Sequence, residues 1–377
     1  MSKPKLKILF IVAEDWYFHS HRLALAIYAI KKGHDVTLLS NYNDHREKIE
    51  NENIRTIDWR SSRNYIGFME ELRSINTLNK IINSCEPNII HAVAIKPVLM
   101  TSLLTKFNRS CSSVFAISGL GYVFTSRKIS AVILKVIFKI LFKTFLNGPQ
   151  NRIIVQNRND YKTLNSGQLI KKGNLRLVKG AGVDVGKFSY KKISSQTQLV
   201  MLPSRMIWTK GIKEFVKCAK KIKSNHRDVK FVLVGMPDHQ NPDSVPKKYL
   251  RDLNSKGIVE WWGYQQEMNE VLYKSRIICF PSTYGEGVPK SLIEAASCGR
   301  PIVTYDVPGC NEIVKHDFNG MLIKPGDIDG LVHSLDSLIK DIELCNTFGM
   351  NGRLIVEKYF SQEKINDETM EIWKELI

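Results

Sequence analysis

The sequence predicts an α/β protein built from two doubly wound units, each with a parallel sheet covered by helices. Short apolar runs alternate with helical stretches along both halves of the chain. The length of 377 residues exceeds one ordinary core, and polar residues from about 187 to 198 separate the halves. We therefore expect a first domain over residues 1–190 and a second over 191–377.

The first half opens with a strand–helix–strand unit. We expect a buried strand over residues 7–13, a loop over 16–22, a helix over 23–32 closed by Gly33, and a strand over 36–40. Such a unit implies a parallel sheet with right-handed crossovers. The first turn, Ala13-Glu14-Asp15, lacks the glycine fingerprint of a dinucleotide fold, so no NAD(P) site is expected there.

The remaining elements follow from periodicity and turn residues. In the first half we expect helices over 66–85, from residue 96, and over 127–146, and strands over 87–91, 114–117 and 152–156. In the second half we expect strands over 199–202, 229–234, 258–262, 277–280 and 301–305, and helices over 211–222, 268–274 and 365–376. Residues 118–124 form a loop whose glycines either open room for a ligand or make a simple turn.

Composition limits the classes of function. No apolar run reaches the 18–20 residues that span a bilayer, and seven cysteines without a CxxC pair indicate reduced thiols, a cytosolic location and no zinc site. The net charge is +18, and residues 1–180 hold 28 Lys and Arg against 12 Asp and Glu. This concentration favours an anionic partner, which is nucleic acid, an anionic membrane surface or a phosphate-bearing acceptor.

The helix expected over 127–146 places Lys135, Lys139 and Lys143 four residues apart, among apolar side chains. This pattern is typical of a basic amphipathic helix at a membrane interface, so the three lysines are predicted to face the membrane. The alternative is a buried helix whose lysines extend to solvent.

The most informative stretch is residues 280–294. An apolar strand ends at Pro281, Gly285 and Gly287 allow a tight turn, and Pro289 fits the first turn of a helix. A helix that begins at the carboxyl end of a strand directs N–H groups and a positive dipole end toward an anion such as phosphate.

Two carboxylates flank this predicted anion site, Glu286 in the loop and Glu294 in the helix. Carboxylates do not bind phosphate, but they accept hydrogen bonds from hydroxyl groups. Arg205 and Lys210 follow the first strand of the second half and offer positive charge to phosphate oxygens. A nucleotide sugar, with phosphates between two hydroxyl-rich rings, satisfies all of these groups.

These motifs resemble a known family. Gly-Glu-Gly before the Glu-x7-Glu spacing, and Ala295, Ala296, Gly299 and Pro301 after it, are similar to the retaining GT-B glycosyltransferases of family 4. The opening Glu14-Asp-Trp-Tyr-Phe resembles the bacterial polysaccharide branch of that family, and the segment at Gly180–Asp184 resembles the family's closing segment of the first domain. The resemblance implies two Rossmann-like domains that face a central cleft, with the last helix packed back on the first domain.

The resemblance also implies roles for residues. Glu286 would hold the donor sugar, Glu294 the ribose, and His91 would contact the donor sugar or assist proton movement; a structural role for His91 is the alternative. The catalytic residues are then Glu286 and His91, and the nucleotide-sugar-binding residues are Arg205, Lys210, Gly235, Gly263, Gly287, Val288, Leu292 and Glu294.

The function implied is transfer of a hexose or N-acetylhexosamine, with retention, from a UDP-sugar to a lipid-linked oligosaccharide precursor of surface polysaccharide. This acceptor is polyprenyl-diphosphate-linked or another glycan, at the inner face of the cell membrane. No metal is expected, because Asp327 and Asp329 form a DxD sequence that fits a helix N-cap. A sugar-nucleotide epimerase on the same fold is the enzymatic alternative. A basic nucleic-acid-binding protein is a third, although no aromatic platforms between Lys and Arg support it.

Overall fold

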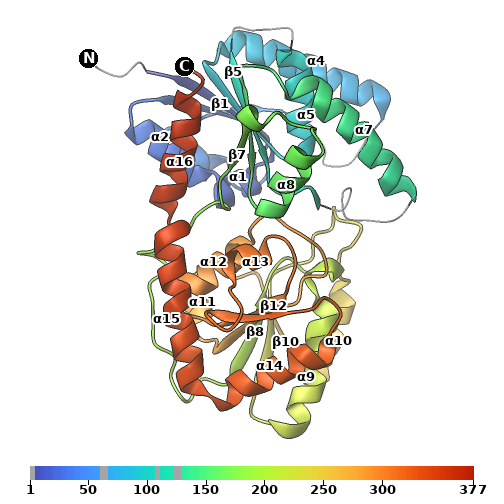
Figure 1. The fold of residues 1–377 in the computed structure, drawn as a ribbon, viewed down its shortest axis with the longest axis vertical. Coiled ribbons are helices and arrows are strands. Elements are labelled where there is room, and N and C mark those ends of the chain that lie inside the picture. Colours follow the sequence, from blue (N-terminus) through green and yellow to red (C-terminus); the bar gives the residue numbers. More distant parts are fainter. Residues whose placement is uncertain (1–4, 60–66, 107–110, 122–128) are drawn as a thin grey trace. The chain divides into compact units, whose positions relative to one another are not determined.

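The computed structural model describes residues 5–59, 67–106, 111–121 and 129–377 (Figure 1). The chain forms two compact units, one made of Met1–Ala181 and Glu363–Ile377 and the other of Gly182–Gln362. The division expected from the sequence, at residue 190, thus lies within the second unit. No described helix is long and apolar enough to cross a membrane.

The first unit contains a parallel seven-stranded sheet in the order β3-β2-β1-β4-β5-β6-β7. The strands are β1 (Lys7–Glu14), β2 (Asp35–Asn41), β3 (Arg55–Asp58), β4 (Ile89–Val93), β5 (Ser112–Ile117), β6 (Asn151–Val155) and β7 (Leu175–Leu177). The order reverses direction between β1 and β4, as in doubly wound sheets, where ligands bind beyond the carboxyl ends of the strands.

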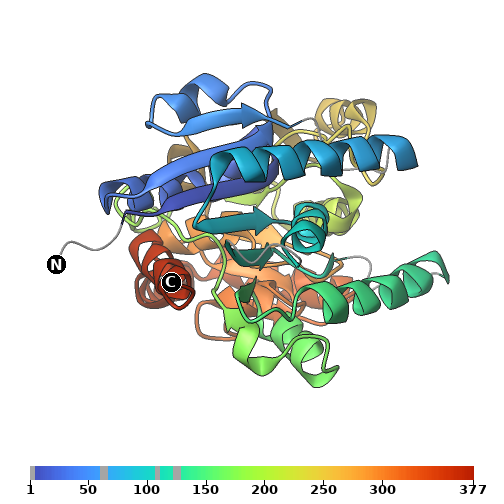
Figure 2. The ribbon, with the colours of Figure 1, turned by 90° about the horizontal axis from the view of Figure 1, so that it is seen from above.

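Helices cover both faces of this sheet (Figures 1 and 2). They are α1 (Asp15–His21), α2 (Leu23–Lys31), α3 (Arg46–Glu50), α4 (Phe68–Cys85), α5 (Ile95–Thr105), α7 (Ile129–Phe145), α8 (Arg158–Ser166) and α16 (Gln362–Lys374), with a short 3₁₀ turn at Lys172–Asn174. Phe18 of α1 and Trp373 of α16 pack in one core layer, and Leu78 of α4 and Phe142 of α7 pack in the other.

The prediction of a loop over residues 16–22 is wrong, because most of this stretch forms helix α1. Phe18 is fully buried and meets Phe10 of β1 with the ring centroids 5.5 Å apart. Asp15 is also fully buried, and its Oδ2 accepts hydrogen bonds from the N–H groups of Asn43 and His45 at 2.8 and 3.0 Å. Burial of one ring and one paired carboxylate therefore fixes this short helix against the sheet. The loop expected over 118–124 is described only as far as residue 121; residues 122–124 lie outside the described part.

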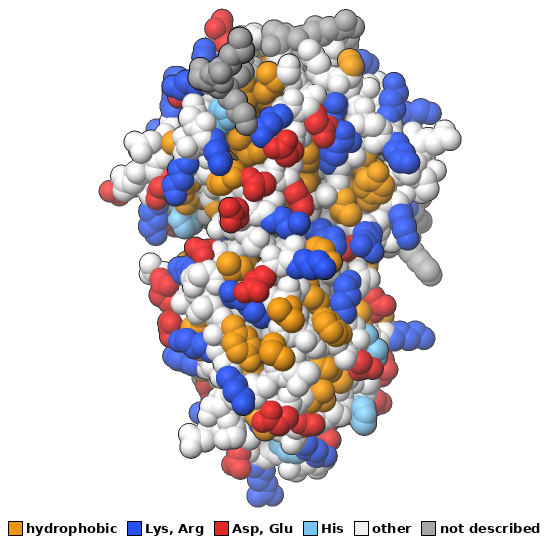
Figure 3. All heavy atoms as spheres, turned by 60° about the vertical axis from the view of Figure 1, so that its left-hand side comes forward, with side chains coloured by type: hydrophobic (Ala, Val, Ile, Leu, Met, Phe, Trp, Pro, Cys, Tyr) orange, Lys and Arg blue, Asp and Glu red, His pale blue; other side chains and the backbone are white. Residues whose placement is uncertain are grey.

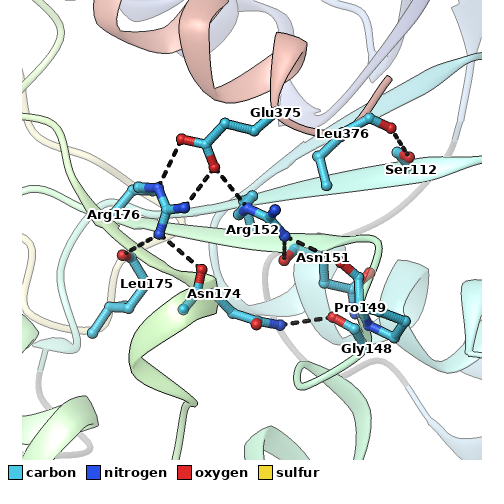
Figure 4. Close-up of polar contacts among 11 residues, drawn as sticks. Ser112, Gly148, Pro149, Asn151, Arg152, Asn174, Leu175, Arg176, Glu375 and Leu376 are labelled. Atoms are coloured by element: carbon cyan, nitrogen blue, oxygen red, sulfur yellow. Dashed lines mark hydrogen bonds and ion pairs between the residues drawn. The ribbon is translucent and has the colours of Figure 1, made fainter.

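The end of α16 is tied to the sheet of the first unit (Figure 4). Glu375 accepts from Arg152 Nε at 2.8 Å and from Arg176 Nη2 at 2.5 Å, and the Ser112 hydroxyl donates to the Leu376 carbonyl at 2.9 Å. These two arginines hold the pKa of Glu375 below its usual value. The C-terminal helix is thus part of the first unit.

The second unit contains a parallel six-stranded sheet in the order β10-β9-β8-β11-β12-β13. Its strands are β8 (Leu199–Pro203), β9 (Lys230–Val234), β10 (Glu260–Gly263), β11 (Ile277–Phe280), β12 (Ile302–Tyr305) and β13 (Gly320–Ile323). Its helices are α9 (Ile212–Asn225), α10 (Lys247–Ser255), α11 (Met268–Tyr273), α12 (Lys290–Ser297), α13 (Cys310–Ile313), α14 (Ile328–Lys340) and α15 (Ile342–Tyr359), with a 3₁₀ turn, η2, at Trp208–Lys210. The predicted fold of two doubly wound parallel sheets is confirmed.

Candidate active site

The loop between β11 and α12 lies at the carboxyl end of a central strand. Every residue of β11 is buried, as the apolar run predicts. Pro289 was expected inside the first turn of the helix; it lies one position earlier, as the N-cap of α12, with φ −61°. Its carbonyl accepts from the N–H groups of Leu292 and Ile293 at 3.0 and 3.3 Å. Strand, glycine loop and helix are thus confirmed in the expected order.

A second loop supports this one from the side. The N–H of Glu286 donates to the Pro308 carbonyl at 2.9 Å, and Gly309 has φ +89°. A Cβ on Gly309 would lie 1.6 Å from the carbonyl oxygen of Gly287, so only glycine fits there. The sequence reading missed Gly309, although the Pro-Gly pair after β12 is a turn signal that marks it.

The turn that follows β8 contacts the same loop. The N–H of Thr283 donates to the Thr209 carbonyl at 2.9 Å. A Cβ on Gly211, which has φ +83°, would lie 2.0 Å from the carbonyl oxygen of Pro281. This close approach places Lys210, the last residue of η2, beside the glycine loop.

Lys210 and Glu286 form an ion pair in this position. Their side chains are only 9% and 13% exposed. Ser282, also missed from the sequence, donates from its hydroxyl to Glu286 Oε1 at 2.9 Å. Burial, followed by the charge of Glu286, raises the pKa of Tyr284 to about 12. The predicted phosphate-binding cation and the predicted sugar-binding carboxylate therefore meet at one place.

Glu294 lies in α12 and is 9% exposed. Lys290 Nζ approaches Glu294 Oε1 at 3.4 Å. Burial raises the pKa of Glu294, and the nearby charge of Lys290 opposes that rise. The carboxylate is held on the first turns of the helix, near the glycine loop.

Glycine amides and carbonyls fill out the site. Gly287 is buried, and within the described residues its N–H donates no hydrogen bond. Gly235 follows β9; its N–H donates to the Gly263 carbonyl at 2.7 Å, and a Cβ on it would lie 1.9 Å from the Ser204 carbonyl oxygen. The carboxyl ends of β8, β9 and β10 therefore meet through backbone contacts and through Trp261 of β10, whose Nε1 donates to the Gly235 carbonyl at 2.8 Å.

The other predicted residues are placed as follows. Arg205 is 42% exposed at its side chain and pairs with Asp238 at 2.6 Å. Val288 and Leu292 are buried in the core of the second unit, so their side chains pack there. The predicted binding residues of the second unit thus surround the ends of β8–β11, and the role of each stays a prediction.

His91 belongs to the first unit and lies inside its core. It is 1% exposed in β4, and its Nδ1 accepts from Trp373 Nε1 at 3.1 Å. Phe10 covers it with ring centroids 5.0 Å apart. Burial, and then the charge of Arg22, lower the pKa of His91 well below its usual value, so the ring is neutral. These contacts favour the structural role that was the alternative, and its catalytic role stays a prediction.

Asp327 and Asp329 take the positions expected of a helix start. Asp327 is the N-cap of α14 and accepts from the Gly330 N–H at 2.8 Å, so the N-cap prediction is confirmed. Asp329 pairs with Lys221 of α9. Within the described part of the chain, no group of three or more His, Cys, Asp or Glu is arranged to hold a metal.

Two protein families match the two halves of the chain. The family described as "Glycosyl transferases group 1" matches residues 187–355, and "Glycosyl transferase 4-like" matches residues 7–157. The first of these spans the whole glycine loop and both of its carboxylates.

Individual relatives are distant but cover most of the chain. The N,N'-diacetylbacillosaminyl-diphospho-undecaprenol alpha-1,3-N-acetylgalactosaminyltransferase of Campylobacter jejuni is 25% identical over 82% of this chain and 83% of its own. The UDP-Gal:alpha-D-GlcNAc-diphosphoundecaprenol alpha-1,3-galactosyltransferase of Escherichia coli is 23% identical over 83% and 81%.

Solved structures show the same fold. The Anabaena protein HepE in complex with UDP and glucose aligns with a TM-score of 0.79 at 16% identity, over 98% of this chain and 99% of that one. Sucrose-phosphate synthase from Thermosynechococcus elongatus aligns with a TM-score of 0.80 at 18% identity, over 99% of each chain.

Proposed function

We infer that this chain is a group 1 (family 4) glycosyltransferase with the GT-B fold. From this premise, we propose that it moves a hexose or N-acetylhexosamine from a UDP-sugar to a lipid-linked glycan. The observation that carries this inference is the meeting of Lys210, Glu286 and the Gly287 amide at the end of β11, with Glu294 one helix turn beyond.

A nucleotide sugar gives each of these groups a partner. Lys210 and the Gly287 N–H would bind the diphosphate, while Glu286 and Glu294 would accept hydrogen bonds from hydroxyls of the sugar and the ribose. Negative charge grows on the leaving diphosphate as the glycosidic bond breaks. A fixed cation at that point stabilises the transition state more than the ground state.

The acceptor is inferred from relatives and from charge. Two relatives are named for acceptors that carry undecaprenyl diphosphate, and both align over about four fifths of this chain. The basic excess lies in the first 180 residues, which favours a phosphate-bearing acceptor there. Retention of the anomeric configuration is the outcome expected of the family that the motifs resemble.

Helix α7 supports a position on an anionic membrane surface. Leu134, Val136, Ile137 and Ile140 are 41–61% exposed, and Lys139 and Lys143 are exposed between them. A helix that only packed in the core would bury these aliphatic side chains. By contrast, the side that carries α2 and α16 has Lys and Arg interspersed with Asp and Glu (Figure 3).

Co-sedimentation with anionic liposomes tests the membrane proposal. Reversal of Lys135, Lys139 and Lys143 to Glu is expected to abolish most binding, because each basic residue near such a surface contributes about 1 kcal/mol. Reversal of Lys213, Lys217 and Lys220, which are exposed on α9, is the matched control. Equal binding by both triple variants would contradict the proposal.

The function itself is tested with a panel of UDP-, GDP- and ADP-sugars in thermal shift, followed by product analysis with a polyprenyl-diphosphate-linked acceptor. We expect stabilisation by UDP-sugars, a glycosylated acceptor and activity that survives EDTA. A changed nucleotide sugar in the absence of acceptor would indicate an epimerase instead.

A further inference from the structure

Arg22 lies at the junction of α1 and α2 and is 6% exposed. Its N–H donates to the Phe18 carbonyl at 2.8 Å, and its own carbonyl accepts from the Ala26 N–H at 3.0 Å. Both of those neighbours are fully buried. The backbone therefore holds the arginine at a fixed place on the inner side of the two helices.

The guanidinium of Arg22 has no acceptor among the described residues. Its Nε is buried without a hydrogen bond, and its other nitrogens form no ion pair or hydrogen bond with the described residues. The neighbouring carboxylate Asp15 accepts instead from backbone N–H groups, including that of Trp16 at 2.7 Å. Burial lowers the pKa of Arg22, but a guanidinium stays charged at neutral pH. A buried charge without a partner is strongly unfavourable.

His91 offers a second donor without an acceptor. Trp373 donates to its Nδ1, and an indole N–H can only donate, so the neutral ring carries its proton on Nε2. Nε2 is buried and has no hydrogen-bond partner among the described residues. Arg22 is near enough for its charge to lower the pKa of this ring, after the larger effect of burial. Arg22 and His91 thus each present a buried donor that no described residue accepts.

We propose that Arg22 and His91 form an oxyanion site in the first unit that takes a phosphate-type group. The fork of the guanidinium matches two oxygens of such a group, and His91 Nε2–H donates to another. Occupancy would neutralise the buried charge and satisfy both donors. This site is separate in the chain from Lys210 and Arg205, which belong to the second unit. Only the identity of the molecule that carries the phosphate rests on the proposed function.

The test is thermal unfolding of the full chain in inorganic phosphate against chloride at equal ionic strength, with saturating UDP to occupy the nucleotide site. We expect the melting temperature to rise by about 3 °C for each tenfold increase of phosphate above its Kd. Geranyl diphosphate replaces inorganic phosphate in a parallel series. Stabilisation at a lower concentration of geranyl diphosphate would assign the site to a prenyl-linked acceptor, whereas preference for inorganic phosphate would assign it to the free anion.

Arg22→Met is expected to abolish the phosphate-dependent rise, and Arg55→Met, at an exposed arginine of the same unit, is expected to keep it. A rise that persists in Arg22→Met, or that is absent from the wild type, would overturn the proposal. Should Arg22→Met impair folding, wild-type crystals soaked in tungstate decide the question. Density within hydrogen-bond distance of Arg22 and His91 Nε2 supports the site, and none at saturation refutes it. Unchanged UDP binding throughout separates this outcome from failure of the proposed function.

Discussion

The two units of the molecule bury a positive charge in opposite ways. In the second unit, Lys210 is buried beside Glu286 and pairs with it. In the first unit, Arg22 is buried with no acceptor among the described residues, and its charge helps to lower the pKa of His91, after the larger effect of burial. A paired cation must give up part of its bonding to its partner when it binds an incoming phosphate, whereas an unpaired one gains stability from any anion that arrives. The partner of each charge, more than the charge itself, therefore indicates what the site can bind.

The largest effect on activity is expected at Glu286, the proposed sugar-binding carboxylate. Glu286→Gln should lower kcat by about 10²–10³-fold, because a neutral amide has one acceptor oxygen and accepts from the donor sugar more weakly than a carboxylate in the transition state. Circular dichroism should show an unchanged fold. Glu343→Gln, at an exposed glutamate of the same unit, is the control. Near-normal turnover by Glu286→Gln would contradict a role of Glu286 in the active site.

Removal of the paired cation should weaken nucleotide binding next. Lys210→Met is expected to raise the Kd for UDP by about 10–100-fold, the loss of one charge-assisted hydrogen bond to phosphate. Isothermal calorimetry measures this change, with Lys213→Met, an exposed lysine on α9, as the matched variant. Equal Kd values for the two variants would show that Lys210 serves only Glu286.

Removal of the two buried charges is expected to change the free energy of unfolding by different amounts. Lys210→Met leaves Glu286 as a buried carboxylate without its cation, and we expect a loss of about 3 kcal/mol in the free energy of unfolding by urea. Arg22→Met removes a buried charge that has no partner among the described residues, so in phosphate-free buffer we expect its stability to equal or exceed that of the wild type. A similar loss in the free energy of unfolding of both variants would contradict this expectation.

Glu294 predicts a pH dependence whose sign follows from its burial. The folded state raises the pKa of this carboxyl, so it holds the proton more tightly than the unfolded chain. Its contribution to stability is full below the unfolded value of 4.5 and is lost as pH rises through the folded pKa. Glu294→Gln should therefore gain stability relative to the wild type over that rise, as measured by urea unfolding. A constant difference across this range would contradict the assignment.

The smallest effect is expected at the surface pairs of the first unit. Glu375 is 36% exposed at its side chain, so loss of its bonds to Arg152 and Arg176 in Glu375→Gln should cost about 1 kcal/mol or less. Thermal unfolding in low and high salt measures it, and the loss should shrink in salt. A cost of several kcal/mol would show that these arginines behave like buried charges.

The strand, glycine loop and helix of the candidate site in the second unit were predictable because they lie within one short stretch. The order of strand, glycine turn and helix over residues 280–294 follows from the local sequence. Glu286 and Glu294 lie within the same stretch. The approach of Gly309 to Gly287, by contrast, joins loops after different strands, and no local pattern encodes it. The ion pair between Lys210 and Glu286 escaped prediction for the same reason.

In the first unit, the sequence carried a signal that was not used. His91 has apolar neighbours at Ile89, Ile90, Ala92 and Val93, a run typical of a strand buried on both faces. That run predicts a histidine inside the core, as observed. Helix α1 was missed because its stretch mixes aromatic residues with four polar ones, and only its packing on β1 reveals the helix.

The ion pairs of Glu375 with Arg152 and Arg176 have a consequence for synthesis of the protein. The first unit is assembled from the earliest and the latest residues of this sequence, since Trp373 fills its core and Glu375 joins Arg152 to Arg176. A nascent chain that emerges in order can complete the second unit first, because that unit is continuous. The sheet that begins at residue 7 must wait, partly uncovered, until the ribosome has added residue 375.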